Sequence, residues 1–111
     1  MIHHLNLCHL PFLAIKENRK SVEMRLYDEK RQNIKIGDIL EFIDLETKEI
    51  LNVEAIDIKL YPSFKELYQD NDKVSLGYKI DEEANYLDML TYYPKERQDR
   101  YQAMAIYIKR I

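Results

Sequence analysis

One short stretch of the sequence alternates clearly between two kinds of side chain: Ser21-Val22-Glu23-Met24-Arg25-Leu26. Apolar residues fall at every second position, and Glu23 and Arg25 fall between them. Because successive side chains of a β-strand point to opposite faces, the apolar set is expected to face the core. Glu23 and Arg25 then project together from the other face, which makes this alternation the most informative pattern of the sequence.

The sequence before this strand predicts one strand and one helix. His3, Leu5 and Leu7 alternate with more polar positions, which is the pattern of a short strand. Pro11 is accepted in a first helical turn, and apolar residues follow it at helical spacing. Asn18 is expected to end this helix, because asparagine tolerates the left-handed conformation that often follows a helix.

The sequence after residues 21–26 predicts a hairpin with a long second strand. Residues 28–33 are polar and predict a turn, residues 39–43 a strand, and residues 46–48 the tip of the hairpin. Residues 50–60 predict the second strand, but its apolar residues change parity at Ala55-Ile56. A slip of one residue exchanges the two faces of a strand, so we expect a β-bulge or a bend there.

The remaining residues predict three short helices and a final strand. Ser63 begins the first helix with Glu66 three residues later, which is the pattern of a capping box. Residues 81–92 predict a second helix, and residues 94–101 a third that opens with a proline. Residues 103–111 are almost continuously apolar, which indicates a strand covered on both faces. Several strands with few peripheral helices predict an α+β fold around a small β-barrel.

Length and composition indicate one ordinary globular domain, residues 1–111. Hydrophobic residues make up 46% and charged residues 33% of the chain, enough to build one core and to solvate its surface. Cys8 is the only cysteine, which excludes an internal disulfide and, without a signal peptide, predicts a reducing, cytoplasmic location. The apolar runs are too short to cross a bilayer, so no membrane association is expected.

The charge distribution is more informative than the net charge of −3. Residues 16–35 contain seven Lys or Arg and four Asp or Glu, a local charge of +3, so the rest of the chain carries −6. An acidic protein is not a general nucleic-acid binder, but one basic segment suits a selected anionic ligand. An ordinary solvated surface explains the same charges, and the charge pattern alone favours that simpler interpretation.

Catalytic and metal-binding motifs of known spacing are absent. The sequence has no phosphate-binding glycine loop, dinucleotide fingerprint or zinc-ligand spacing, so no cofactor and no metal is expected. His3, His4, Cys8 and His9 form a cluster, but on a strand the first and last share one face and the middle two share the other. We interpret them as surface or lining side chains, with a metal site as the minority alternative.

The strongest candidate site is the polar face of the strand predicted over residues 21–26, together with the turn that follows it. Lys20, Glu23 and Arg25 are followed by Asp28, Lys30 and Arg31. The cations suit a phosphate, a carbonyl or a base edge, and an ionised carboxylate suits an exocyclic amino group. Glu23 beside two cations is expected to stay ionised, which favours hydrogen-bond acceptance over acid catalysis. Salt bridges on an exposed strand face explain the same spacing about equally well.

Nine tyrosines against three phenylalanines are a second indication, because tyrosine stacks on bases and still offers a hydroxyl group. Tyr68, Tyr86 and Tyr93 lie where helix packing accounts for them. Tyr27 lies next to the polar residues of the candidate site. It is the tyrosine that we predict to contact a ligand.

Several blocks of the sequence match one known signature. Lys20, Glu23 and Arg25 on one strand are followed by an Asp28-Glu29-Lys30-Arg31 turn and by Gly37-Asp38 before the next strand. This arrangement resembles the ASCH domain family, and the resemblance continues through residues 63–68, residues 76–78 and the last strand. The resemblance implies a PUA-like β-barrel, a cleft lined by the Lys20, Glu23 and Arg25 strand, and a role linked to RNA.

The same resemblance supplies an enzymatic alternative. Some ASCH relatives are small amidohydrolases that remove an acyl group from the exocyclic nitrogen of cytidine, with a lysine that matches Lys20, a threonine nucleophile and a distant glutamate. Here Glu23 stands at the threonine position. In such an enzyme Lys20, Glu23 and Arg25 would be catalytic, with the lysine activating Ser21 or a water and the arginine stabilising an oxyanion. Lys20 and Ser21 are strand neighbours and point oppositely, which favours binding over catalysis.

The sequence therefore predicts a module that binds RNA or a modified nucleoside. The alternatives are an amidohydrolase that acts on an acylated nucleoside such as N4-acylcytidine, and a protein-interaction domain. The predicted ligand-binding residues are Lys20, Glu23, Arg25, Tyr27, Asp28, Lys30 and Arg31. Glu23 and Arg25 are expected to face an accessible cleft with Lys20 at its rim. The oligomeric state is open, with a monomer expected.

Overall fold

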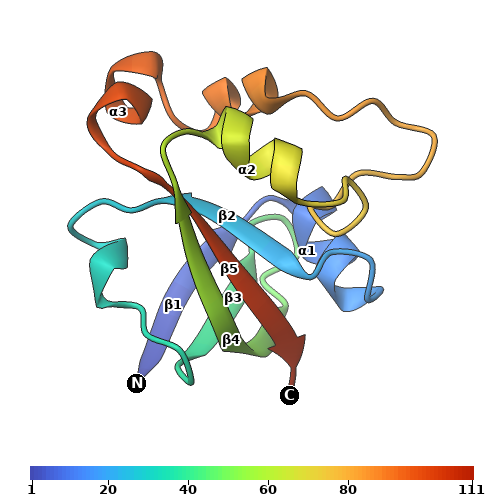
Figure 1. Cartoon of the computed structure of the whole chain (residues 1–111). Coiled ribbons are helices and arrows are strands. Elements are labelled where there is room, and N and C mark those ends of the chain that lie inside the picture. The colour runs from blue at the N-terminus through green and yellow to red at the C-terminus, as the bar shows by residue number, and fades with distance from the viewer.

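The computed structural model describes all of residues 1–111 and contains one five-stranded mixed sheet (Figure 1). The strands are β1 (Ile2–Leu7), β2 (Val22–Leu26), β3 (Ile39–Asp44), β4 (Ile50–Tyr61) and β5 (Ala103–Arg110). Their order across the sheet is β1-β3-β4-β5-β2. β1 pairs with β3 in parallel, and all other neighbours are antiparallel. The first two strands of the chain are therefore the two edges of the sheet.

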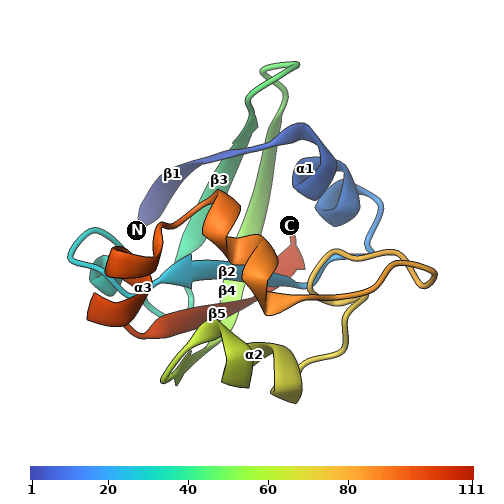
Figure 2. The ribbon, with the colours of Figure 1, turned by 90° about the horizontal axis from the view of Figure 1, so that it is seen from above.

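Short helices cover the sheet (Figures 1 and 2). They are α1 (His9–Lys16), α2 (Phe64–Asp70) and α3 (Lys95–Arg100), with the 3-10 helices η1 (Arg31–Asn33) and η2 (Tyr86–Thr91). Asn18 adopts a φ of 62° just after α1, as predicted. Ser63 caps α2 as predicted, because its hydroxyl accepts a hydrogen bond from the Lys65 N–H and donates one to the Glu66 carboxylate. No helix of the chain has the length and apolarity of a membrane span.

Two helix predictions are wrong in part. The helix predicted over residues 81–92 forms only as η2. It starts late because the Asn85 side chain accepts a hydrogen bond from the Leu87 N–H and so caps the helix at that point. α3 begins at Lys95, and Pro94 precedes it as an extended N-cap residue instead of being its first helical residue. Residues 81–84 form no helix, so the helix predicted over residues 81–92 is shorter than expected.

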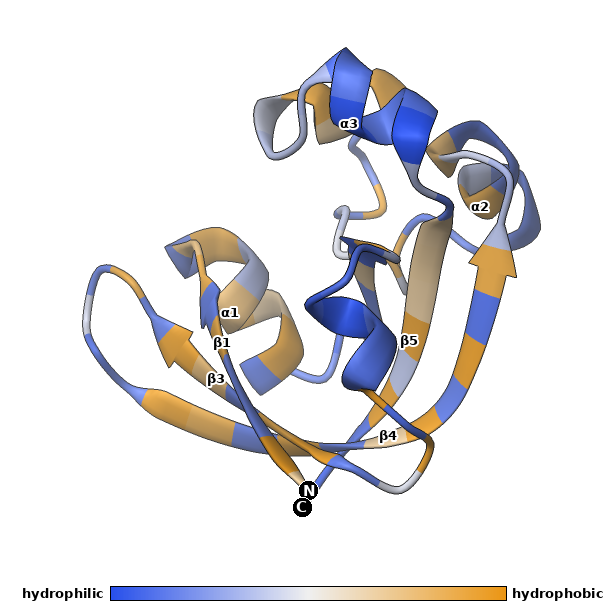
Figure 3. Ribbon diagram, turned by 90° about the vertical axis from the view of Figure 1, so that its left-hand side faces the viewer, coloured by the Kyte–Doolittle hydropathy of each residue, from blue (hydrophilic) through white to orange (hydrophobic).

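The sheet curls into a half-barrel because β4 is long and bent (Figure 3). The first half of β4 pairs with β3 and the second half with β5, and the register shifts between Ala55 and Asp57. This shift confirms the predicted bulge: Ala55 is buried, Ile56 is half-exposed, and Ile58 packs against the core again. The half-barrel with its short peripheral helices confirms the predicted α+β fold.

β5 separates two hydrophobic cores. Met104, Ile106 and Ile108 belong to the inner core, which fills the half-barrel together with α1, β1, β3 and β4. Ala103 and Ala105 belong to an outer core, which β2 shares with α2 and η2. Alternate residues of β5 therefore serve opposite cores, which explains why this strand is apolar along most of its length.

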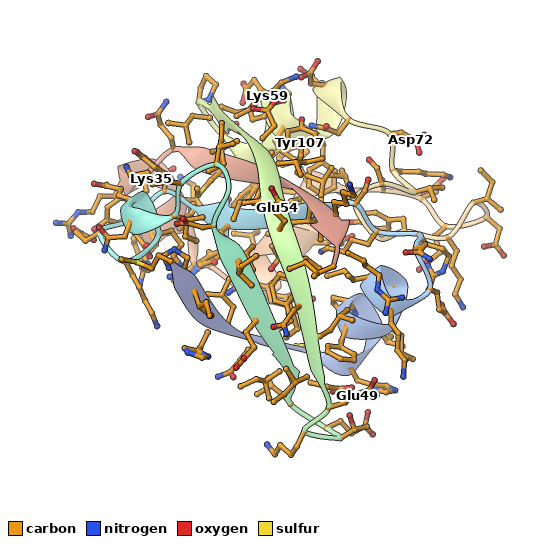
Figure 4. All side chains as sticks on the ribbon, turned by 90° about the horizontal axis from the view of Figure 1, so that it is seen from below. Lys35, Glu49, Glu54, Lys59, Asp72 and Tyr107 are labelled. Atoms are coloured by element: carbon orange, nitrogen blue, oxygen red, sulfur yellow. The ribbon has the colours of Figure 1, made fainter.

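Charged and polar side chains lie on the outer side of the sheet (Figure 4). Glu54 and Lys59 come from β4 and Tyr107 from β5. The Lys59 ammonium lies 5.4 Å from the centre of the Tyr107 ring, a distance at which a cation is attracted to an aromatic face. The polar residues of β2 point the other way, because Glu23 and Arg25 pair with Ile106 and Met104 of the inner core.

Candidate functional site

A cleft of about 750 Å³ opens where the half-barrel does not close, between β1 and β2. Its walls come from β2, from β1 with the start of α1, and from residues 76–93, which include η2. The view from above shows η2 and α1 near β2 (Figure 2). Cavities of this size hold small organic ligands. The cleft is therefore the candidate site.

Glu23 lies in the cleft between two cations. Its Oε1 is 3.0 Å from Lys20 Nζ, and its Oε2 accepts a 2.7 Å hydrogen bond from Arg25 Nε. All three residues line the cleft, and the side chains of Lys20, Glu23 and Arg25 are only 7%, 3% and 11% exposed. We call these three residues the cleft triad. It occupies the polar face of the strand that the sequence alternation identifies.

The cleft triad keeps Glu23 ionised. Burial by itself would raise the pKa of the Glu23 carboxyl, but the charges and hydrogen bonds of Lys20 and Arg25 outweigh it and hold the pKa below its usual value. Burial would lower the pKa of Arg25, and the Glu23 charge outweighs it in turn. An ionised carboxylate fixed between donors is a hydrogen-bond acceptor, not an acid.

Arg25 also spans the gap in the barrel. Its Nη2 donates a 3.1 Å hydrogen bond to the backbone carbonyl of Asn6 on β1. β1 pairs with β3 on one side only, so this carbonyl lies on an unpaired sheet edge. By holding Arg25 Nε, Glu23 orients the guanidinium toward that edge. The cleft triad therefore joins the two edge strands as well as lining the cleft.

Lys20 lies deep in the cleft and not at its rim, contrary to the prediction. A loop runs back along the start of β2, where the Ser75 carbonyl accepts hydrogen bonds from the N–H groups of Ser21 and Val22. This loop brings Gly77 against the lysine, so that a Cβ atom at Gly77 would lie 3.1 Å from Lys20 Cδ. A distant segment of the chain thus covers the lysine, and the sequence around Lys20 does not indicate this contact.

The structure brings Arg31 into the cleft but leaves Tyr27, Asp28 and Lys30 outside it, contrary to the prediction. Tyr27 packs half-buried against the inner core. Asp28 is buried because its carboxylate is held by Arg31 at 2.8 Å and by Arg97 at 2.6 Å. Lys30 is exposed on the turn that precedes η1. The turn after β2 therefore supplies one cation to the site.

Four tyrosines line the cleft, and Tyr27, which the sequence predicted as a ligand contact, is not one of them. The four are Tyr68, Tyr78, Tyr92 and Tyr93. The hydroxyl oxygens of Tyr68 and Tyr78 are 2.9 Å apart, and Tyr78 donates a 2.7 Å hydrogen bond to the Asp88 carboxylate. Burial and these hydrogen bonds raise the pKa of Tyr78, so its hydroxyl stays protonated. The surplus of tyrosine is the sequence signal for these residues, but helix packing is the stronger explanation of Tyr68 and Tyr93, and no local pattern predicts Tyr78 or Tyr92 as a ligand contact.

The sequence profile of the ASCH domain matches residues 5–111, which is nearly the whole chain. The chain belongs to the ASCH domain family. Hypothetical protein PH0355, known from a crystal structure, is 31% identical to this ASCH domain, with a TM-score of 0.84 and 100% of both chains covered. Protein PF0455 from Pyrococcus furiosus is 30% identical, with a TM-score of 0.71, and the match covers 100% of this chain and 98% of that one.

A more distant structure shares the fold of this ASCH domain. ASCH from Zymomonas mobilis is 14% identical, with a TM-score of 0.68, and the match covers 97% of this chain and 66% of that one. At this identity the likeness concerns the fold and not the site. No curated protein sequence matches the chain.

The cleft of this ASCH domain has nearly balanced charges. Five cations and four carboxylates line it: Arg19, Lys20, Arg25, Arg31 and Lys79 with Glu17, Glu23, Glu82 and Asp88. Several of them are paired with one another, among them Arg19 with Glu17 at 2.8 Å. A lining of this kind suits a small ligand with few charges better than a long polyanion.

The histidines of this ASCH domain pair separately with carboxylates. The pairs are His3 with Asp38, His4 with Glu41 and His9 with Asp44, each at 2.7 Å. His9 belongs to α1 and not to a strand, so the prediction that it shares a strand face with His3 is wrong. No group of three or more His, Cys, Asp or Glu side chains is arranged to hold a metal ion.

Proposed function

We propose that this ASCH domain binds a nucleoside or nucleotide, free or within RNA, and that the cleft triad reads the edge of the base. The observation that supports the proposal is the setting of Glu23, an ionised acceptor fixed between two cationic donors inside a cleft of about 750 Å³. The edge of a base presents donors and acceptors side by side, which is the pattern that such a triad complements.

Each residue of the cleft triad has a distinct role in this proposal. Glu23 accepts a hydrogen bond from an exocyclic amino group or a ring N–H group of the base. Lys20 and Arg25 donate to a carbonyl oxygen or a ring nitrogen beside it. Tyr92 is half-exposed at the cleft and stacks on the face of the base. Because these contacts are few, affinity depends on the cleft and only weakly on salt concentration.

An amidohydrolase that acts on an acylated nucleoside remains the enzymatic alternative, with weaker support. The lowered pKa of Glu23 makes this carboxylate a poor general base. Ser21 is exposed and lines a second, smaller pocket, which Lys20 also borders, whereas the Lys20 ammonium is held by Glu23 in the cleft, which Ser21 does not line. Catalytic turnover of an acylated nucleoside and protein interaction are therefore alternative outcomes of the binding test described next.

Calorimetric titration of nucleosides and short RNAs against the wild type and three variants tests the proposal. Glu23→Gln turns half of the acceptor group into a donor, so it should cost about 1–3 kcal/mol for the preferred base and change which base is preferred. Lys20→Ala should weaken all ligands more uniformly, because a point charge reads little of the base. Lys30→Ala is the matched control, a lysine of the same basic segment that lies outside the cleft.

The outcomes separate the three functions. A change of base preference in Glu23→Gln, with Lys30→Ala unchanged, supports base recognition by the cleft triad. Mass spectrometry of the incubated ligands detects a deacylated product, which would favour the amidohydrolase. If the wild type binds no member of the panel, the proposal fails and a protein-interaction domain becomes the better explanation. Equal weakening by Lys30→Ala and Lys20→Ala would also contradict it, since binding would then follow overall charge.

A further inference from the structure

Arg31 has unused hydrogen-bonding capacity in the cleft. Its side chain is 15% exposed, and its Nη1 donates a 2.8 Å hydrogen bond to Asp28 Oδ2. Its Nε is the one enclosed side-chain nitrogen or oxygen of the protein that has no hydrogen-bond partner, and such exceptions are rare in folded proteins. Its Nη2 makes no hydrogen bond within the protein and is not enclosed. Most of the five donors of this guanidinium are therefore unused.

The charge of Arg31 is also incompletely neutralised. Asp28 supplies a single negative charge, and Arg97 shares it from the other side, with its Nη2 at 2.6 Å from the same oxygen. Both guanidiniums stay charged at neutral pH. The three residues, which we call the turn triad, thus hold one uncompensated positive charge. Arg31 is the only member of the turn triad that lines the cleft.

The position of Arg31 gives the cleft two different ends. Lys20 precedes β2 and Arg31 follows it, while Glu23 and Arg25 lie on the strand between them. A strand rises about 3.3 Å per residue, so the end of β2 is roughly 10 Å from Glu23 along the strand. A base held at Glu23 therefore leaves the far end of the cleft, with the accessible Nη2 of Arg31, for another part of the same ligand.

We infer that Arg31 forms a phosphate subsite of the cleft, so that the ligand is a nucleotide and not a free nucleoside. The inference rests on the proposed base recognition and adds the phosphate group to it. An accessible guanidinium nitrogen with net positive charge suits a phosphate oxygen in both geometry and charge. The phosphate belongs either to the monoester of a free nucleotide or to a diester of RNA, since both present the same oxygens.

Calorimetry with one nucleoside, its 5′- and 3′-monophosphates and a dinucleotide that contains it tests the subsite. The wild type should bind at least one phosphorylated form about tenfold more tightly than the nucleoside, which corresponds to about 1.4 kcal/mol. Arg31→Gln should remove this gain, so that the nucleoside and its phosphorylated forms bind the variant about equally. Preference for the dinucleotide identifies an RNA diester as the source of the phosphate, and preference for a monophosphate identifies a free nucleotide.

Arg97→Gln is the comparison variant, because it removes a positive charge of the turn triad from outside the cleft and leaves the Arg31 guanidinium in place, so it should lower the phosphate gain less than Arg31→Gln does. Arg31→Lys keeps the charge without the planar guanidinium and should retain part of the gain. Thermal melting of the three variants identifies any that fail to fold. The comparison of the nucleoside with its phosphorylated forms on the wild type does not depend on the variants.

Two results would overturn the phosphate subsite while leaving base recognition intact. The first is equal affinity of the wild type for the nucleoside and all its phosphorylated forms. The second is equal weakening of nucleoside and nucleotide binding by Arg31→Gln, which would mean that Arg31 only shapes the cleft. If the wild type binds none of the four compounds, both the subsite and the proposed function fail.

Discussion

The cleft triad and the turn triad are built alike and placed differently. Each consists of one carboxylate side chain that is only 3% exposed and two cations that hold it. Both cationic side chains of the cleft triad are nearly enclosed, whereas Arg97 of the turn triad is 47% exposed. Glu23 therefore depends on protein partners alone, while Asp28 has one partner that water also solvates.

The two triads also differ in the distance along the chain between their members. Lys20 and Arg25 come from the same short stretch as Glu23. Arg97 reaches Asp28 from α3, far along the chain, and so fastens that helix to the turn after β2. We interpret the difference as a division of roles. The cleft triad presents its charges to the cleft, whereas the turn triad holds the fold together and contributes one arginine, Arg31, to the cleft.

Removal of the shared carboxylate is the most severe test of this comparison. Glu23→Ala leaves Lys20 and Arg25 as enclosed cations without a counter-charge, and should lower the free energy of unfolding by about 3–5 kcal/mol. Asp28→Ala should cost less, because the Arg97 guanidinium can turn toward water. Urea denaturation at neutral pH measures both losses. A larger loss for Asp28→Ala would show that the exposure of Arg97 does not relieve the turn triad.

The cleft triad could be predicted from the sequence because its geometry is local. The period of two in a strand already requires that Glu23 and Arg25 share a face, and it also reveals the bulge after Ala55. The turn triad could not be predicted, since nothing near Asp28 in the sequence indicates Arg97. Such a pair depends on where α3 lies in the finished fold.

The far wall of the cleft was beyond sequence reasoning for the same reason. Lys20 was expected at the rim because the strand pattern says nothing of Gly77, which covers it. Tyr27 was expected in the site because it lies next to polar residues, yet its ring packs against the inner core. The cleft tyrosines Tyr78 and Tyr92 come from an irregular segment, whose position depends on long-range contacts and not on a local period.

Gly77 supports the cleft triad and has no counterpart in the turn triad. Its φ is +112°, which side chains with a Cβ rarely adopt, and an added Cβ would crowd Lys20 at 3.1 Å. Gly77→Ala should therefore lower the free energy of unfolding by about 1–3 kcal/mol and also weaken ligand binding by shifting Lys20. Denaturation and calorimetric titration measure the two effects.

Gly37→Ala is the matched control for this prediction. Gly37 has a φ of +93°, but an added Cβ there meets no atom within 4 Å. The backbone strain should be similar but the crowding absent, so the loss of stability should be smaller than for Gly77→Ala, while ligand binding stays unchanged. If both variants weakened binding equally, the support of Lys20 by Gly77 would have no part in the site.

The smallest expected effect is a change in how stability responds to acid. Burial would raise the pKa of Glu23, but Lys20 and Arg25 lower it below the usual 4.5. A carboxyl whose pKa is lower in the folded state contributes stability above its unfolded pKa, and this contribution is lost as the pH falls through the folded pKa. Glu23→Gln has no ionisable group at this position, so it lacks that contribution at every pH.

The quantity to measure is the difference in unfolding free energy between the wild type and Glu23→Gln, from urea denaturation at a series of pH values. The difference should be constant above about pH 5, where Glu23 is ionised in both folded and unfolded chains, and should shrink at lower pH. Asp38 and Asp44, whose pKa values are both lowered to about 2, titrate in both proteins and therefore cancel from the difference. A difference that grew on acidification would mean that the folded protein binds the proton of Glu23 more tightly than the unfolded chain does. Burial would then outweigh the two cations, and Glu23 would be a donor in the cleft instead of the acceptor on which base recognition depends.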